Sequence, residues 1–169
     1  MHLVLASLLG LLSLVVCALP PQWKAYSSTE GRFSVTVPDD PRVSTVATDT
    51  ADGKVLTHIV SATDKDLNEY LVSWTAYNRE VESKGTEQTL DQMRDALIHA
   101  KNGKLSSEST VSLMNHAGRA VTFVDDVGRT VSVRFYFIGN RAFQVMAESR
   151  NQASLSDAEK FFKSFSVQE

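Results

Sequence analysis

The second half of the chain contains four strand-like segments in a row, separated only by short turns. The segments cover about 104–113, 119–125, 130–138 and 141–149, with Asn115-His116, Val127-Gly128 and Gly139-Asn140 between them. Turns this short join antiparallel neighbours, because a parallel pair needs a crossover of a dozen or more residues. The sequence therefore predicts an antiparallel meander. We expect its last two strands at the centre of the sheet, with one apolar face shared by Val131, Val133, Phe135, Phe137, Phe143, Val145 and Ala147.

The first half of the chain adds strands of the same kind. Residues 31–38 alternate Phe33, Val35 and Val37 with polar side chains and end at Pro38, which is typical of a half-buried strand. Segments at about 54–63 and 70–77 repeat this alternation on either side of the polar stretch 64–66. The whole chain thus predicts a sheet of about six to seven strands.

Two segments have the three- and four-residue spacing of a helix. Leu90, Met93, Leu97 and Ala100 predict a helix over about 86–101, beginning near Thr86 and a Thr89–Gln92 capping box. We expect it to end at Asn102-Gly103, with the glycine in the left-handed cap conformation. A second capping box, Ser156 to Glu159, opens a helix that carries Phe161, Phe162 and Phe165. The predicted fold class is α+β, a single antiparallel sheet with helices packed on its faces in an α/β/α sandwich.

The chain opens with an almost uninterrupted apolar run, Leu3 to Leu19, which carries no charge and stops at Pro20-Pro21. Ala18 supplies the small residue that a signal peptidase needs. We predict a signal peptide over 1–18 and one domain over 19–169, and hence an exported protein, periplasmic or secreted. Two alternatives stay open: an uncleaved N-terminal anchor, and a lipoprotein lipidated on Cys17, which is the chain's one cysteine. Either would place the protein at a membrane through its leader alone.

Three stretches resemble the PsbP-like group of short exported bacterial proteins. They are Trp23 to Pro38 with its Gly31-Arg-Phe33, Gly139 to Met146, and the closing Lys160-Phe-Phe-Lys-Ser-Phe165. The resemblance implies an antiparallel sheet with helices on its faces, similar to the extrinsic photosystem subunit PsbP and to a nuclear-import factor that binds the GTPase Ran. Because these motifs describe core packing, the resemblance implies a fold and carries over no catalytic or binding residue.

Charge and motif spacing argue against several kinds of function. A net charge of −3 provides no basic face for nucleic acid. His58, His99 and His116 lack metal-ligand spacing, so we expect ordinary surface or boundary histidines and a nearly neutral His58→Ala. Asp39-Asp40 and Asp125-Asp126 are expected in solvated turns. None of the eight glycines forms a phosphate loop, and we expect no cofactor and no metal.

Arginines are the least ordinary feature of the last four predicted strands. Some of them could gather into a ligand patch that grips a carboxylate or phosphate; these are Arg119, Arg129, Arg134 and Arg141. Alternatively they lie on a solvent face and are balanced by acidic side chains. Trp23, Tyr70 and Trp74 either belong to the core or line a ligand pocket.

These observations predict a non-catalytic exported binding or accessory domain whose partner is a protein or a small ligand. Two alternatives remain: an envelope lipoprotein anchored through Cys17, and an enzyme whose site is assembled from scattered polar residues. The sequence gives no indication of the oligomeric state.

Overall fold

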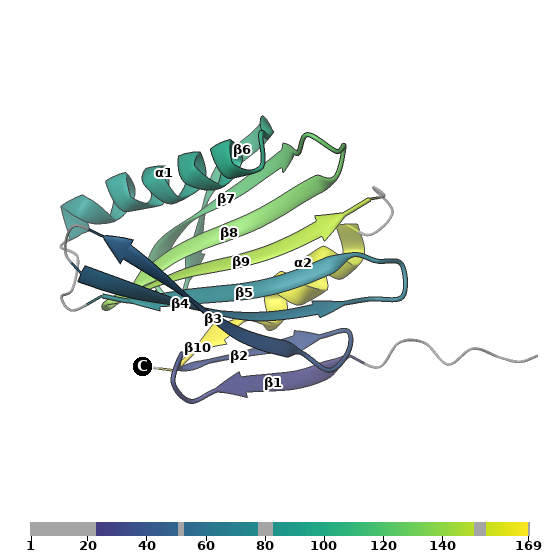
Figure 1. The fold of residues 1–169 in the computed structure, drawn as a ribbon, viewed down its shortest axis with the longest axis horizontal. Helices are drawn as coiled ribbons and strands as arrows, with labels where there is room; N and C mark the ends of the chain where they lie inside the picture. The colour runs from purple at the N-terminus through teal and green to yellow at the C-terminus, as the bar shows by residue number, and fades with distance from the viewer. Residues whose placement is uncertain (1–22, 51–52, 78–82, 151–154, 169) are drawn as a thin grey trace, which may run out of the picture.

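The computed structural model describes residues 23–50, 53–77, 83–150 and 155–168 (Figure 1). The predicted signal peptide over 1–18, its cleavage point and Cys17 lie outside the described residues.

A seven-stranded antiparallel sheet forms the middle of the molecule (Figure 1). Its strand order is β3-β4-β5-β9-β8-β7-β6, and each neighbouring pair is antiparallel. The strands are β3 (Arg42–Thr50), β4 (Gly53–Thr63), β5 (Glu69–Ala76), β6 (Lys104–Leu113), β7 (His116–Val124), β8 (Thr130–Ile138) and β9 (Arg141–Ser149). The predicted meander from β6 to β9 is confirmed, and β9 is the central strand with β8 beside it.

The prediction of a single sheet is wrong. The strand expected over 31–38 is β2 (Phe33–Val37), which lies in a separate three-stranded sheet between β1 (Lys24–Ser28) and β10 (Ser166–Val167). Phe33, Val35 and Val37 are fully buried because this small sheet packs against one face of the large sheet. Strands β1 and β3 were not predicted, because their side chains are mostly exposed and show no apolar alternation, and β10 was not predicted because it has only two residues.

In the described part of the chain, one helix packs on each face of the large sheet. Helix α1 (Ser83–Ala100) packs on β7 and β8, where Leu90 joins Val121, Phe123 and Phe135 in one buried cluster. Helix α2 (Leu155–Ser164) lies on the other face against β2 and β9, and Phe161, Phe162 and Phe165 enter a second cluster with the small sheet. We call these two sides of the sheet the α1 face and the α2 face.

The expectation that β8 and β9 share one apolar face is also wrong. The two-residue turn Gly139-Asn140 pairs Ile138 with Arg141, so Tyr136 lies opposite Phe143 and Arg134 opposite Val145. Opposite residues point to the same side of a sheet, which places Phe143 and Val145 on the α2 face while Val131, Val133 and Phe135 pack under α1. Strand β8 is therefore apolar on the α1 face but carries Ser132 and Arg134 on the α2 face, opposite Ala147 and Val145 of β9.

Helix α1 begins three residues before the predicted Thr86, so the Thr89–Gln92 pattern lies inside the helix. At its other end Asn102, not Gly103, takes the left-handed conformation, with φ of 45°. The Gly103 N–H donates to Ile98 O at 2.8 Å and the Asn102 N–H to His99 O at 3.1 Å, which is a Schellman cap. Gly103 is needed for space, because a Cβ there would lie 2.8 Å from Phe123 Cε2.

Candidate functional site

The structure distributes the four arginines of the predicted ligand patch over both faces and both ends of the sheet. Arg119 reaches α1 on the α1 face, whereas Arg134 reaches α2 on the α2 face. Arg129 lies beside the turn before β8, and Arg141 beside the turn after it. The four side chains therefore do not gather into one patch.

Arg119 is held by carboxylates between α1 and β6. Its guanidinium donates to Glu108 at 2.7 Å, to Glu87 at 2.5 Å and to Asp91, and Arg94 also contacts Glu108 at 2.8 Å. Although partial burial opposes ionisation of Glu108, the two guanidinium groups hold the pKa of its carboxyl below the usual value. These donors already have anionic partners within the chain.

Arg129 belongs to an ion-pair network at the end of the sheet. Its Nε donates to Asp125 Oδ2 at 2.7 Å and its Nη1 lies 3.0 Å from Glu148 Oε2, while Lys101 pairs with the other oxygen of Glu148. The expectation of a solvated turn is wrong for Asp125, which is buried and accepts hydrogen bonds from the backbone N–H groups of Val127 and Arg129. Burial opposes its ionisation, but the donors from Arg129 and Val127 lower the pKa of the carboxyl overall.

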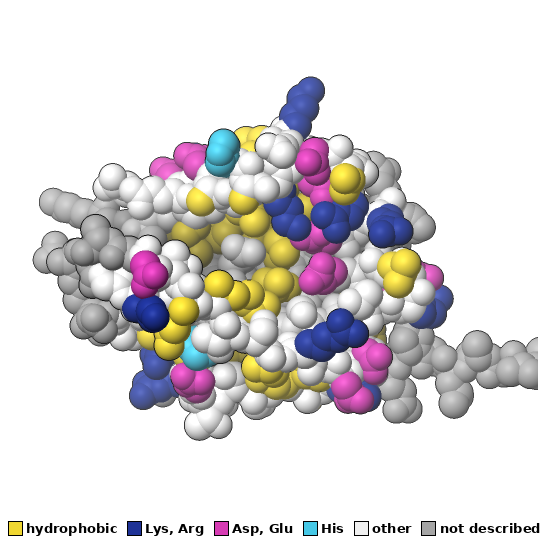
Figure 2. Space-filling model, in the orientation of Figure 1, with side chains coloured by type: hydrophobic (Ala, Val, Ile, Leu, Met, Phe, Trp, Pro, Cys, Tyr) yellow, Lys and Arg dark blue, Asp and Glu magenta, His cyan; other side chains and the backbone are white. Residues whose placement is uncertain are grey.

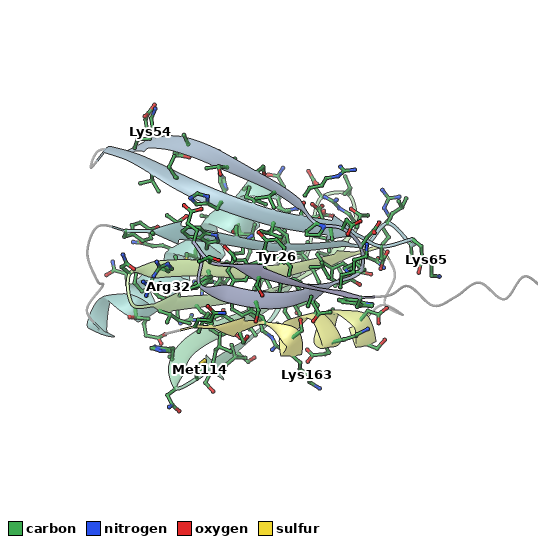
Figure 3. All side chains as sticks on the ribbon, turned by 90° about the horizontal axis from the view of Figure 1, so that it is seen from below. Tyr26, Arg32, Lys54, Lys65, Met114 and Lys163 are labelled. Carbon is green, nitrogen blue, oxygen red and sulfur yellow. The ribbon has the colours of Figure 1, made fainter. Side chains whose placement is uncertain are left out.

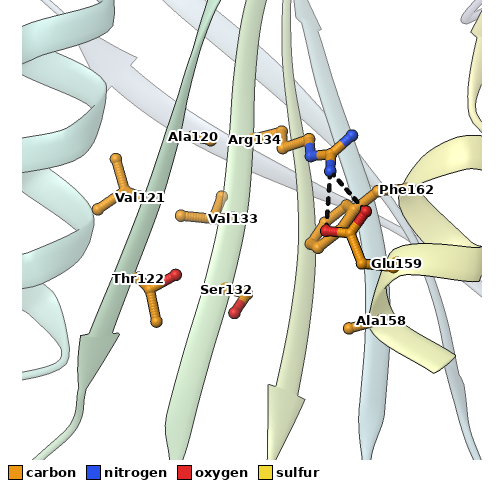
Figure 4. Close-up of a pocket in the computed structure, with 9 residues that line it drawn as sticks. All are labelled: Ala120, Val121, Thr122, Ser132, Val133, Arg134, Ala158, Glu159 and Phe162. Carbon is orange, nitrogen blue, oxygen red and sulfur yellow. Dashed lines mark hydrogen bonds and ion pairs between the residues drawn. The ribbon is translucent and has the colours of Figure 1, made fainter. Parts of the chain in front are cut away.

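Of the four arginines in the predicted ligand patch, Arg134 lines a pocket (Figure 4). The pocket has a volume of about 300 Å³ and lies on the α2 face between β7, β8 and α2. Strand side chains on this face are small or carry a hydroxyl, namely Ala120, Thr122 and Ser132, and α2 supplies Ala158, Glu159 and Phe162.

The Arg134 side chain is held at the edge of this pocket by a carboxylate and an aromatic ring. Its Nη2 donates to the carboxylate of Glu159 at 3.0 and 3.2 Å, and its guanidinium carbon lies 4.5 Å from the centre of the Phe162 ring (Figure 4). A guanidinium has five N–H donors, and the two contacts to Glu159 use one terminal nitrogen. The Glu159 side chain is half exposed, so the ion pair faces solvent on one side.

The remaining candidates from the sequence lie apart from this pocket. Arg141 donates to Asn140 Oδ1 at 3.3 Å. His58 stacks on Trp74 with ring centroids 4.1 Å apart and contacts Thr45 Oγ1 at 3.1 Å. We therefore expect its replacement to cost more stability than the replacement of an exposed histidine. His99 is exposed near the end of α1, and His116 begins β7.

Two further candidates are placed at the surface and in the core. Asp39 and Asp40 are exposed, and Asp40 pairs with Lys24 at 2.6 Å. Tyr70 and Trp74 are buried in the core of the α2 face, where Tyr70 contacts the Trp23 ring at 5.2 Å.

A hollow on the α1 face was not predicted. Figure 2 shows it below α1, with hydrophobic side chains inside. The register of β5 and β9 turns Leu71, Ser73, Thr75 and Gln144 to this face, beyond the strands on which α1 packs. Within the described residues, no group of three or more His, Cys, Asp or Glu side chains could hold a metal ion.

The sequence did not single out most of the residues that line the pocket at Arg134. Ala120, Thr122 and Ser132 are ordinary strand residues, and the face to which they point depends on turns that fix the register. Glu159 belongs to the Ser156–Glu159 capping-box pattern, which predicts the start of a helix and not a ligand site. The one available signal is the polar alternation of Ser132 and Arg134 with the apolar residues of β8.

No protein-family model matches the sequence, and no curated protein matches it. Among solved structures, the chain is similar to the solution structure of cyanobacterial PsbP (CyanoP) from Synechocystis sp. PCC 6803. The TM-score is 0.57 at 13% sequence identity, and the match covers 90% of this chain and 96% of that one. The fold is therefore PsbP-like, as predicted. At this identity the likeness concerns the fold alone.

None of the helices in the described part of the chain is long and apolar enough to cross a membrane.

Proposed function

We propose that this chain is an exported, non-catalytic accessory domain that binds a small ligand in the pocket at Arg134. The ligand class is a molecule with an apolar body and one anionic group, such as a carboxylate or phosphate. The observation that carries the proposal is the position of Arg134, whose guanidinium lies at the edge of a pocket with largely apolar walls. Ligand sites commonly combine such walls with a few well-placed polar groups.

Glu159 occupies the place that the ligand's anionic group would take. It is the half-exposed partner of Arg134, so it can turn into solvent at little cost, since surface ion pairs contribute only about 0–1 kcal/mol. The Phe162 ring would keep the guanidinium in position when Glu159 leaves. The hydroxyls of Thr122 and Ser132 add two further hydrogen-bonding groups along the strands.

The surroundings of the pocket support binding over catalysis. Its one acid and one base, Glu159 and Arg134, pair with each other, and the three described histidines lie on β4, α1 and β7. An arginine also makes a poor general base, because it stays protonated at physiological pH. The alternatives of an enzyme with a scattered site and of a lipoprotein anchored through Cys17 have no comparable observation in their favour.

The test uses anilinonaphthalene sulfonate, a fluorescent probe with an apolar body and one anionic group. We expect the probe to bind the folded chain, Arg134→Gln to weaken binding, and Ala120→Leu to block it by filling the pocket. Glu159→Gln should strengthen binding, because it removes the internal competitor. Arg150→Gln, a change of an exposed arginine elsewhere, is the matched control.

The Glu159→Gln variant tests whether Glu159 competes with the ligand for Arg134. If it binds the probe no better than the unmodified chain, or if Arg150→Gln weakens binding as much as Arg134→Gln does, the ligand does not lie at Arg134.

A further inference from the structure

Strand β3 is an outer edge of the large sheet, and its free side carries no neighbouring strand among the described residues. It pairs with β4 over all nine of its residues without a break in register. Its side chains from 42 to 49 are all exposed, including Val43 at 62% and Val46 at 49%. The β3–β4 hairpin ends next to Lys54, which projects from one side of the molecule (Figure 3).

Natural sheets protect their edges with charges, prolines, bulges or short strands. The opposite edge, β6, has such features: its register shifts between Leu105 and Ser107, and its Glu108 is tied to Arg94 and Arg119. The turn after β6, at Met114, lies on the far side of the molecule from Lys54 (Figure 3). In β3, Arg42 and Asp49 stand near the ends, and residues 43–48 contain no charge, proline or glycine. The backbone N–H and C=O groups on its free side are therefore open to another strand.

A second copy of this chain is a poor occupant of the β3 edge. Two copies of β3 would pair as antiparallel strands around a two-fold axis normal to the sheet, and this axis leaves each face of the sheet on its own side. Residues that lie opposite each other must therefore point to the same side. Arg42 and Asp49 point to opposite sides because strand side chains alternate, so they cannot face each other in such a pair. The symmetric register that pairs Val46 with Val46 of the second copy places Asp49 opposite the apolar Val43. A partner strand whose sequence differs from that of β3 avoids this mismatch.

We propose that β3 is a docking edge, to which an extended segment of a partner protein adds as a further antiparallel strand. The partner segment would be apolar opposite Val43 and Val46, on opposite sides of the sheet, and acidic opposite Arg42, which has no ion-pair partner among the described residues. Backbone hydrogen bonds supply the affinity in this mode of recognition, and alternate side chains supply the specificity. This interaction does not depend on the pocket at Arg134.

The probe is a labelled, capped peptide, Thr-Ser-Val-Thr-Thr-Val-Glu, whose order places its two valines opposite Val46 and Val43 and its glutamate opposite Arg42. Fluorescence anisotropy measures its binding to the full chain, and amide hydrogen exchange reports protection of β3. Val46→Lys introduces a charge in the middle of the edge, and Leu105→Lys is the matched control on the opposite edge, where Leu105 is 46% exposed.

We expect the peptide to slow exchange in β3, Val46→Lys to weaken binding about tenfold or more, and Leu105→Lys to leave binding unchanged. A lysine in place of the peptide's glutamate should also weaken binding, and Arg42→Glu should restore it. Unchanged exchange in β3 at saturating peptide would overturn the proposal, as would equal weakening by Leu105→Lys. Self-association of the free chain that Val46→Lys abolishes would assign the edge to a second copy instead.

Discussion

Gly118 provides the sharpest test of how the α2 face is packed. It lies in β7 directly opposite Tyr136, whose buried ring stacks on Phe165 with centroids 6.1 Å apart. A Cβ at this position would contact Tyr136 Cδ1 and would lie 2.6 Å from both Tyr136 Cε1 and Phe135 O. Its φ is not positive, so an alanine is excluded by lack of space and not by backbone conformation.

We expect Gly118→Ala to lower the free energy of unfolding by about 3 kcal/mol, the upper end of the usual cost of overpacking, because the Phe135 carbonyl belongs to a paired strand and cannot move aside. For a domain of this size the unfolding midpoint should fall by about 6–12 °C in a thermal melt followed by circular dichroism. Gly139→Ala is the control: it meets no atom within 4 Å but has φ of 60°, so its cost of about 1 kcal/mol comes from the backbone.

A second variant identifies the clashing ring. Gly118→Ala combined with Tyr136→Ala should lose less stability than the sum of the two single changes, because removing the ring makes room for the new methyl group. Strict additivity, or a Gly118→Ala variant as stable as Gly139→Ala, would refute the packing described for this face.

Three further outcomes are expected. His58→Ala should cost about 1 kcal/mol in chemical denaturation through the lost stack on Trp74, and a neutral result would contradict that contact. The pKa values of Asp125 and Glu108 are lowered in the folded chain, so their stabilisation is present above their usual values of 3.8 and 4.5 and is lost as pH falls through the folded ones. The melting temperature of the protein should therefore be constant near neutral pH and should fall below about pH 4. In Asp125→Asn it should fall less steeply over the same range. Cleavage after Ala18 should give a mature N-terminus at Leu19 by mass spectrometry, and fatty-acid labelling that Cys17→Ala abolishes would instead establish the lipoprotein alternative.

Local patterns predicted most elements of the fold because their causes are local. The turn at Gly139-Asn140 requires an antiparallel pair, and the spacing of Leu90 and Leu97 requires one buried helix face. The small second sheet could not be predicted in this way. It forms because β10, at the end of the chain, pairs with β2 near its beginning, and no local pattern reports that contact.

The candidate site was predictable only in part for a related reason. The sequence identified Arg134 as a strand arginine, but strand periodicity does not say which layer lies over each face. The partners of Arg119 and Arg134 come from Glu87 on α1 and Glu159 on α2, which are distant in sequence. Arg119 and Arg134 point to opposite faces of the sheet, and each face is covered by a different helix. The two arginines are therefore far apart, although the sequence predicts that they gather in one patch.

The two proposed binding surfaces should act independently. Strands β4, β5 and β9 lie between β3 and β8, so the docking edge and the strand that carries Arg134 are roughly 19 Å apart at the usual strand spacing. Strand addition at β3 extends the sheet outward and requires no movement of α2 or Glu159. We therefore expect saturating anilinonaphthalene sulfonate to leave the affinity for the probe peptide unchanged. A change of fivefold or more, about 1 kcal/mol of coupling, would show that the sheet transmits ligand binding to its edge, and the two surfaces would then have to be treated as one site.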